Sequence, residues 1–308
     1  MAGRTAPFSG FEWMIAWRYL RARRAEGGVS VMTWISLIGI TLAVFALIVT
    51  LAVRAGFRAE FVDTILGANA HVTVYTSDRI DDSGARLQGF ETYADLSAAL
   101  SAVPGVTRAA PVVKGQVIVT DGTRTSGAEV YGMSAADLAS LPRVGTGAQA
   151  IGDLARYPEG IAMGSVLARE LGVTVGDRVR LTSASGVRTA MGTASRQKVY
   201  EITYVFTAGR YDIDKVRIYM PFAEAQSFFN REGFADEIEV MVADPEHIEE
   251  MALPILNAAG PEAMLWTWKD SAGGFLRALD IEDNVMFIIM AILVLIASLN
   301  IVSGLIML

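Results

Sequence analysis

The sequence predicts an α+β membrane protein in which two transmembrane helices flank one mixed α and β domain. Two apolar runs without any charged residue, 25 residues at 29–53 and 24 residues at 285–308, predict the helices. The 231 residues between them, 54–284, mix strand-like alternation with helix-like periodicity and predict the domain. Because the chain has no cysteine, a packed core must stabilise this domain without disulfide bonds.

Both apolar runs are long enough to cross a bilayer. At about 1.5 Å per residue, each helix exceeds the roughly 30 Å of the hydrocarbon core. A secretory signal peptide is the alternative for the first run, but its apolar region has only about 7 to 15 residues and ends in a cleavage site. The sequence LAVRAGF at the end of the run offers no such site. An open strand in lipid would leave backbone groups unpaired, so both runs are predicted to be helical.

The placement of arginines predicts the orientation. Residues 1–28 contain two acidic residues and five arginines, Arg4, Arg18, Arg21, Arg23 and Arg24. Cytoplasmic flanks of a span carry the excess of Lys and Arg, so this segment is predicted to be cytoplasmic and residues 54–284 extracytoplasmic. Trp13 and Trp17 among the arginines indicate a helix at the headgroup level, with an ordinary positive flank as the alternative.

The extracytoplasmic domain is predicted to be acidic. The whole chain has 26 basic and 33 acidic residues, and removing the five and two before the first span leaves 21 and 31, a net charge of −10. This charge argues against binding to nucleic acid and against a domain that lies on anionic lipid.

The first half of the domain is predicted to contain a strand, a helix and a hairpin. Residues 71–77 alternate as a strand does, and residues 91–103 read as a helix that Pro104 and Gly105 end. Residues 112–132 predict two strands joined at Asp121 and Gly122.

The second half adds helix and strand in alternation. Residues 164–183 predict a short helix with Ser165 as N-cap and then a strand, and residues 198–209 and 215–222 predict further strands. Residues 237–256 predict a strand and then a helix with Asp244 as N-cap and Pro245 at its first position. The expected layout is a βα lobe nearest the membrane, built from the two ends of the domain, with a β-rich insert from about Lys114 to about Phe234.

One stretch of the insert, TSASGVRTAMGTASRQ at 182–197, is small, polar and rich in glycine. This composition is typical of a long exposed hairpin or loop between two strands. Long loops are usually functional or disordered, and composition alone favours a disordered or plain linker.

The sequence predicts no catalytic or metal site. It has no phosphate-binding loop, no G-x-S-x-G motif and no nucleophile with a base, which disfavours an anchored enzyme. Its two histidines are His71, inside a predicted strand, and His247. The acidic residues around His247, namely Glu246, Glu249 and Glu250, could suggest a metal site, but acidic residues in the first turn of a helix complement its dipole. Asp212 and Asp214 are predicted to lie in a solvated turn.

Four stretches, taken in order, resemble the LolC/LolE family, the permease subunits of the lipoprotein-releasing ABC transporter of the Gram-negative inner membrane. They are IAWRYLRARR…ISLIGITLAVFALIVTLAVRAGFRAEFVDTILGANAHVTV, LARELGVTVGDRVRL, MGTASRQKVYEI and FLRALDIEDNVMFIIMAILVLIASLNIVSGLIML. The resemblance implies a multi-pass protein of the cell inner membrane with a MacB-like periplasmic domain. The alternatives are a MacB-like or FtsX-like mechanotransmission permease for another substrate, and a two-span receptor with a periplasmic sensor domain.

The resemblance also implies partners. A separate cytoplasmic ABC ATPase would hold ATP and Mg, leaving no cofactor in this chain, and a second permease protomer would be either a second copy or a paralogue. A periplasmic chaperone would receive the lipoprotein substrate from the membrane lipid. The positions that match the acyl-chain cavity are Val53, Phe57, Met286 and Ile289, with ordinary lipid-facing or packing surface as the alternative.

By the same resemblance, residues 183–197 correspond to a hairpin that recruits the chaperone. Met191 would lie near its tip, and Arg180, Gln197 and Lys198 would contact the partner at its base. Arg54 and Ala55 stand where many relatives carry an uncharged Met-Asn, so the resemblance leaves the outer rim of the cavity open at this position, and an anchor is the alternative role for Arg54. Because the family has four spans, the chain is expected to be a fragment.

Overall fold

The computed structural model describes residues 10–21, 27–67, 69–77, 79–80, 86–87, 89–145, 147, 149–189 and 192–307. The chain divides into two compact units, one formed by residues 1–58 and 275–308 and the other by residues 59–274.

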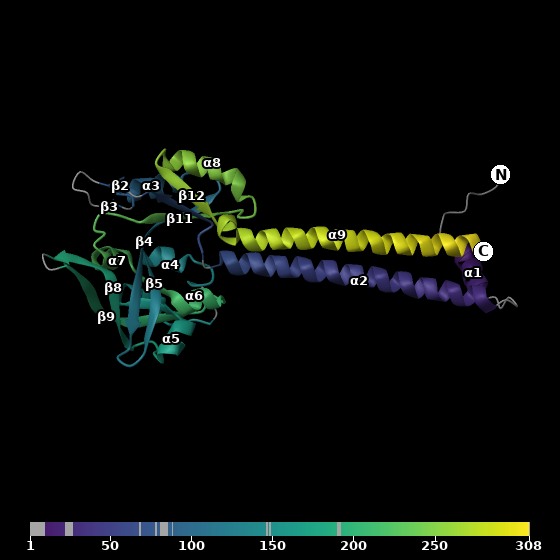
Figure 1. Ribbon diagram of the computed structural model, residues 1–308, viewed down its shortest axis with the longest axis horizontal. Helices are drawn as coiled ribbons and strands as arrows, with labels where there is room; N and C mark the ends of the chain where they lie inside the picture. The colour runs from purple at the N-terminus through teal and green to yellow at the C-terminus, as the bar shows by residue number, and fades with distance from the viewer. Residues whose placement is uncertain are drawn as a thin grey trace. The chain divides into compact units, whose positions relative to one another are not determined.

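The first unit contains a short helix, α1 (Gly10–Arg21), and most of two long helices, α2 (Gly27–Leu66) and α9 (Trp268–Met307). The stretches Leu37–Phe57 and Leu276–Ser303 are long and apolar enough to cross a membrane, by length and composition. Within this unit α2 and α9 lie side by side and run in opposite directions (Figure 1). Two helices of this kind are what the charge-free runs of the sequence predict.

The second unit is a mixed α and β domain with two lobes. The first lobe contains β1 (Val72–Thr76), β2 (Arg79–Ile80), β3 (Arg86–Leu87), α3 (Tyr93–Ser101), β11 (Glu237–Val242), α8 (Ile248–Ala259) and β12 (Ala263–Thr267). The second lobe contains β5 (Thr125–Met133), α4 (Ala135–Ala139), β6 (Ile151–Gly152), η1 (Leu154–Glu159), β7 (Ile161–Gly164), α5 (Ser165–Leu171), β8 (Arg178–Thr189), β9 (Gly192–Phe206), α6 (Tyr211–Val216), β10 (Arg217–Pro221) and α7 (Phe222–Phe229).

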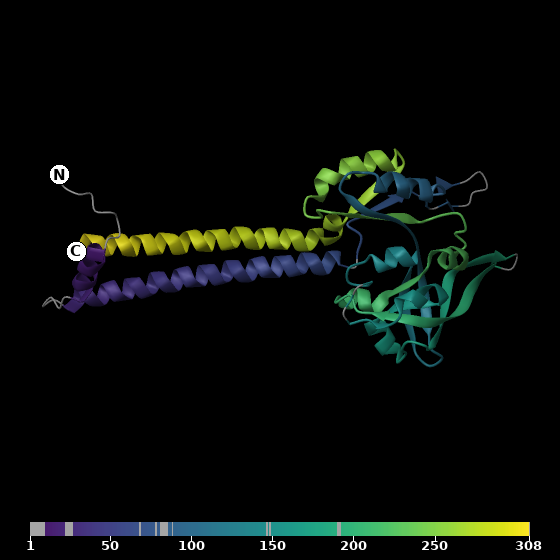
Figure 2. The ribbon, with the colours of Figure 1, turned by 180° about the vertical axis from the view of Figure 1, so that it is seen from behind.

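One strand, β4 (Val106–Thr120), belongs to both lobes. Its first half pairs with β11 in the antiparallel sheet β12-β1-β11-β4, and its second half pairs with β5 from Val113 onward. Figure 2 shows α3 and α8 over the first sheet, on the side away from the second lobe. The two lobes are therefore joined by a continuous strand as well as by loops.

The second lobe is a small closed barrel. Each strand of the cycle β4-β5-β10-β7-β9-β8 pairs with two others, and β8 closes the cycle by pairing with β4. The inward side chains alternate with outward ones and form one apolar core, which the large residues of α5 and α7 complete. Closing the sheet removes unpaired edges that would otherwise template aggregation.

Fixed contacts join the inner ends of both long helices to this domain. At the end of α2, Gly67 O accepts a hydrogen bond from Arg143 N at 2.9 Å, and Asn69 Oδ1 accepts one from Arg217 at 3.1 Å. At the start of α9, Trp268 N donates to His71 O at 3.0 Å and Trp268 Nε1 donates to Pro245 O at 2.7 Å. The end of α2 is thus held to the barrel and the start of α9 to the first lobe.

A buried cluster of charged and aromatic residues lies where the lobes meet. The guanidinium of Arg217 on β10 stacks 4.3 Å from the centre of the Tyr131 ring and donates to the Tyr131 and Tyr219 hydroxyls. From the first lobe, Glu239 on β11 pairs with Arg108 at 3.4 Å. Burial raises the pKa of the Tyr219 hydroxyl. Hydrogen bonds to hydroxyl and amide groups hold the Arg217 charge in the interior, and the Asp137 and Glu239 carboxylates hold that of Arg108.

Glu237 on β11 is the carboxylate of this junction whose titration is most affected. Its side chain is 12% exposed and its Oε1 lies 2.5 Å from Lys114 Nζ on β4. Burial raises the pKa of Glu237 to about 7, although the attraction of Lys114 opposes this shift. The carboxyl therefore holds its proton more tightly in the folded chain than in the unfolded one.

Several local predictions are confirmed and others are wrong by a few residues. The hairpin at Asp121 and Gly122 is present as β4 and β5. Ser165 is the first residue of α5 and Gly164 is its N-cap. The helix expected from Pro245 begins at Ile248, because the Asp244 carboxylate accepts hydrogen bonds in a turn that precedes α8.

Other elements were missed or assigned differently. Asp212 and Asp214, expected in a solvated turn, lie in α6, because buried Asp214 accepts hydrogen bonds from Ala208 N and Gly209 N and anchors the helix. The edge strand β12 was not expected from its short sequence AMLWT.

We predict that Glu237→Gln flattens the pH dependence of stability. A folded-state pKa raised from the ordinary 4.5 to about 7 gives stability that is present below pH 4.5 and lost as the pH rises through 7. The wild type should therefore lose about 1–3 kcal/mol relative to the variant between pH 4.5 and 8. Thermal unfolding of the purified chain at both pH values measures this, with exposed Glu232→Gln as control. A wild type that gains on the variant as the pH rises would contradict it.

Candidate functional site

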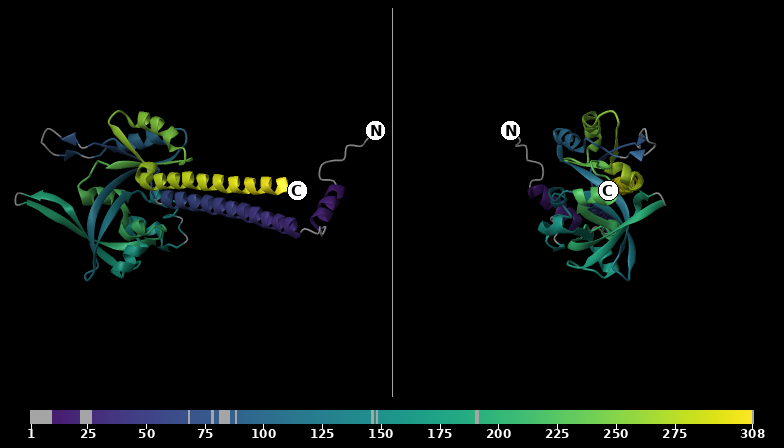
Figure 3. Two further views of the ribbon diagram at one scale, coloured as in Figure 1. Left: turned by 45° about the vertical axis from the view of Figure 1, so that its right-hand side comes forward. Right: turned by 90° about the vertical axis from the view of Figure 1, so that its left-hand side faces the viewer.

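The sequence 182–197 forms the outer part of a β-hairpin. Strands β8 and β9 pair from Arg178↔Glu201 to Thr189↔Gly192, so most of this stretch is strand and not an irregular linker. Between the pairs Ser183↔Arg196 and Val187↔Ala194, three residues on β8 oppose one residue on β9. Such a bulge bends a hairpin and increases its twist. Figure 3 shows the two strands extending beyond the rest of the barrel.

Strand register places a set of side chains on the outer face of the barrel at the base of this hairpin. Directly opposed residues of antiparallel strands share a face, as do residues two apart along one strand. The pairings connect Thr120, Arg180 and Val199 in one row and Ile118, Thr182 and Gln197 in the next. We call these six residues the outer face.

The outer face combines apolar surface with polar groups. The side chains of Ile118 and Val199 are 51% and 50% exposed, and Arg180 and Gln197 are exposed beside them. Sequence reasoning identified Arg180 and Gln197 but missed the two apolar residues. An available signal was the run Val117, Ile118, Val119, in which a strand with one buried face carries an apolar residue at the outward position.

Lys198 lies on the opposite side of β9 from Arg180 and Gln197. Its Nζ is 2.7 Å from Glu224 Oε1 on α7 and 5.3 Å from the centre of the Tyr200 ring. The Tyr200 hydroxyl donates to the same carboxylate at 2.6 Å, and burial followed by this hydrogen bond raises the Tyr200 pKa. The structure therefore groups Arg180 with Gln197 and directs Lys198 toward α7. Met191 lies outside the described residues.

The four positions of the expected acyl-chain cavity fall on different faces of the long helices. Val53, Phe57 and Ile289 are 66%, 55% and 45% exposed, whereas Met286 is half-buried. Among the described residues of the spans, the half-buried positions recur every three or four residues, with one interval of seven between Met290 and Ala297, as expected for two helices packed along one seam. On α2 they are Ile40, Ala43, Leu47, Thr50 and Arg54, and on α9 they are Leu276, Leu279, Asp283, Met286, Met290 and Ala297.

Arg54 makes a contact that the sequence reasoning did not foresee. Its guanidinium forms an ion pair with the Asp283 carboxylate of α9. The signal was available, since an arginine ends the first charge-free run and a pair of acidic residues precedes the second. An anchor was the alternative role for Arg54, and the structure gives it a partner within the chain.

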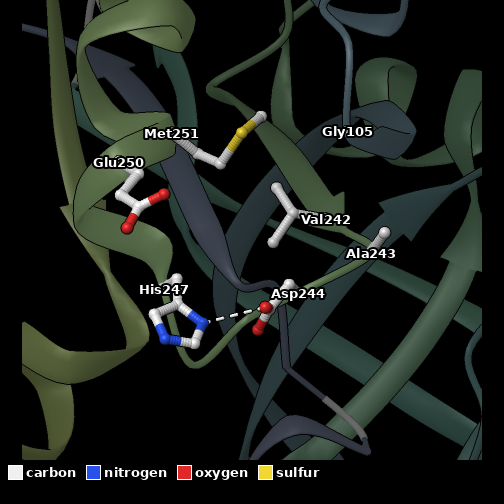
Figure 4. A pocket seen from close by; sticks show the side chains of 7 residues that line it. All are labelled: Gly105, Val242, Ala243, Asp244, His247, Glu250 and Met251. Atoms are coloured by element: carbon white, nitrogen blue, oxygen red, sulfur yellow. Dashed lines mark hydrogen bonds and ion pairs between the residues drawn. The ribbon is translucent and has the colours of Figure 1, made fainter.

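A pocket of about 410 Å³ lies at the start of α8, between that helix and the end of β11 (Figure 4). Its lining residues are Gly105, Val242, Ala243, Asp244, His247, Glu250 and Met251. The His247 ring and the Asp244 carboxylate face one another at 2.8 Å, and this hydrogen bond raises the His247 pKa. The lining residues include no Ser, Thr, Cys or Lys side chain that this histidine could activate as a nucleophile.

The remaining titratable groups have structural partners. His71 Nδ1 accepts a hydrogen bond from Val242 N at 3.0 Å, and burial lowers the His71 pKa, which keeps the ring neutral. No group of three or more potential metal-binding side chains occurs among the residues that the structure describes. The strongest site features are therefore surfaces, namely the outer face with its hairpin and the seam between the spans.

Comparison with known proteins shows sequence similarity along most of the chain. A family model for the MacB-like periplasmic core domain matches residues 33–255. The lipoprotein-releasing system transmembrane protein LolC of Neisseria meningitidis is 27% identical over 300 residues, covering 96% of this chain and 70% of that protein. The corresponding protein LolE of Haemophilus influenzae is 26% identical with the same coverage. The periplasmic region of MacB from Actinobacillus actinomycetemcomitans has a TM-score of 0.44 and 12% identity, covering 70% of this chain and 95% of that one.

The family match covers well over half of the chain, and the LolC and LolE proteins align with nearly all of it, spans included. The chain is a membrane protein that belongs to the family with a MacB-like periplasmic core domain and, within it, to the LolC/LolE transmembrane proteins.

Proposed function

We propose that this chain is a permease subunit of a lipoprotein-releasing ABC transporter. The observation that carries the proposal is the similarity to LolC and LolE over 96% of the chain, which includes both long apolar helices and the whole domain between them. An exposed hairpin with an apolar patch at its base supports a role in which the domain hands a substrate to a partner.

The proposal assigns nucleotide chemistry to another subunit. The sequence has no phosphate-binding loop, so a separate cytoplasmic ATPase would hold ATP and Mg and drive the cycle. A second permease protomer would complete the membrane part. The arginines before the first span favour a cytoplasmic N-terminus, which would put residues 59–274 in the periplasm of a cell whose inner membrane would hold the helices.

The outer face would bind the chaperone together with the hairpin. Each exposed apolar side chain buried on binding contributes about 25 cal/mol per Å² of apolar area, and Ile118 and Val199 are both available for this. Arg180 would steer an acidic partner surface in a salt-dependent way, and Gln197 would supply a hydrogen bond at the rim. The ammonium group of Lys198 would contribute indirectly, because its ion pair with Glu224 holds α7 against β9.

We predict that replacing residues 184–195 by a short Gly-Ser turn abolishes chaperone binding without unfolding the domain. This replacement keeps the Ser183↔Arg196 pair, and with it every pairing of β8 with β4. Calorimetric titration of the purified chain with the chaperone and thermal unfolding are the two measurements. Equal affinity in both proteins would mean that the hairpin is a linker.

A point variant tests the outer face separately from the hairpin. Val199→Ser should weaken chaperone binding about tenfold, because the loss of one buried aliphatic side chain costs about 1.4 kcal/mol or more. Ile151→Ser is the matched control, since Ile151 is 59% exposed in the same lobe but lies on β6. A control that loses as much affinity as the variant would contradict the assigned face.

We predict that lipoprotein acyl chains contact Phe57 and Met286. A photo-crosslinker at either position, in the full protein with its ATPase, should capture lipoprotein more efficiently than one at Phe287. Phe287 is the matched control because it neighbours Met286 on α9 but is 68% exposed and points about 100° away. Equal capture at Phe287 would show that the helices meet acyl chains only as ordinary membrane lipid.

A further inference from the structure

The ion pair between Arg54 and Asp283 connects the two membrane-spanning helices of this chain. Arg54 is the single charged residue within Leu37–Phe57, and Asp283 lies within Leu276–Ser303. Their side chains are 36% and 30% exposed, so each covers part of the other. The two residues are 229 positions apart in sequence, and nothing local brings them together.

Both residues belong to the seam along which α2 and α9 face each other. The other half-buried seam positions described above are aliphatic, Met or Thr, so the ion pair is the charged contact among them. Apolar helices gain little by associating in lipid, because the lipid tails are as apolar as their side chains. The attraction between Arg54 and Asp283 is therefore the main specific interaction that holds α2 against α9 at this point of the seam.

Separating the pair is costly. An unpaired charged side chain at the end of an apolar helix must extend to the headgroups or to water, which costs free energy. Arg54 and Asp283 each remove this cost for the other while they remain paired. The seam thus has a closed state favoured by the pair and an open state that needs another source of free energy.

The pair lies between two residues proposed to touch acyl chains. Phe57 follows Arg54 by three residues and Met286 follows Asp283 by three, each about one turn along its helix. Figure 1 shows that α2 and α9 run in opposite directions. A residue that follows Arg54 and one that follows Asp283 therefore lie on opposite sides of the pair along the spans. An acyl chain that contacts both residues must pass the level of the ion pair.

We propose that Arg54 and Asp283 form a latch between the two spans, and that a substrate acyl chain reaches Phe57 and Met286 together only when this latch opens. The substrate part of the inference rests on the proposed function. The latch itself rests on the ion pair and on its position in the seam between α2 and α9.

The test uses the absence of cysteine from the chain. Arg54→Cys with Asp283→Cys should form a disulfide under mild oxidation in membranes. The oxidised protein, assembled with its ATPase and carrying a photo-crosslinker at Phe57, should lose at least nine-tenths of lipoprotein capture. Reduction should restore capture to within twofold of the protein with Arg54 and Asp283. Undiminished capture by the protein whose disulfide has formed would overturn the latch.

A charge reversal tests the pair without lipoprotein. Arg54→Asp and Asp283→Arg should each lower the thermal unfolding midpoint of the purified chain, because like charges then face one another. The double reversal should regain most of that loss, whereas Glu282→Arg, one exposed position away, should change little. Reversals that are additive would overturn the pairing. If the protein with Arg54 and Asp283 captures no lipoprotein, the proposed function fails, and these midpoints still decide the ion pair.

Discussion

The domain is organised around a single strand that serves two sheets. At Val112 and Val113 two consecutive residues of β4 are both completely buried, although consecutive side chains of a strand point to opposite faces. Val112 packs into the core beside β10 and η1, and Val113 into the barrel core. Both faces of β4 are therefore covered where the partner changes from β11 to β5. The barrel cannot close without the same strand that completes the first sheet.

This constraint explains why charged side chains occur in the interior at the junction. Where the two sheets diverge from this strand, Arg217 of β10 is close enough to Glu239 of β11 to feel its charge. Arg217 stacks on Tyr131, and Arg108 lies between Asp137 and Glu239. Buried ion pairs contribute little net stability compared with well-packed apolar residues, but losing one partner is costly. These ion pairs therefore determine how the two lobes meet more than they add to the free energy of unfolding.

The parts of this fold that depend on local physics could be predicted from sequence, and those that depend on distant pairing could not. Length and lack of charge suffice for the spans, and Asp121 with Gly122 suffices for a hairpin. The closure of β8 onto β4 needs two strands that are about sixty residues apart, and no local signal marks it. The site shows the same division. Resemblance located the hairpin, but the side on which Lys198 lies depends on strand parity, and the partner of Arg54 depends on the rotation of two helices about their axes.

The attachment of the two long helices has a mechanical consequence. The end of α2 is tied to β10 through Asn69 and Arg217, whereas the start of α9 is tied to β1 through His71 and to the turn before α8 through Pro245. A pull on one helix thus enters the domain at a different sheet from a pull on the other. β4 runs through both sheets, so a difference between the two pulls becomes shear along its hydrogen-bond ladders. Backbone ladders resist shear because many hydrogen bonds are loaded together, so this strand couples the two lobes of the domain stiffly.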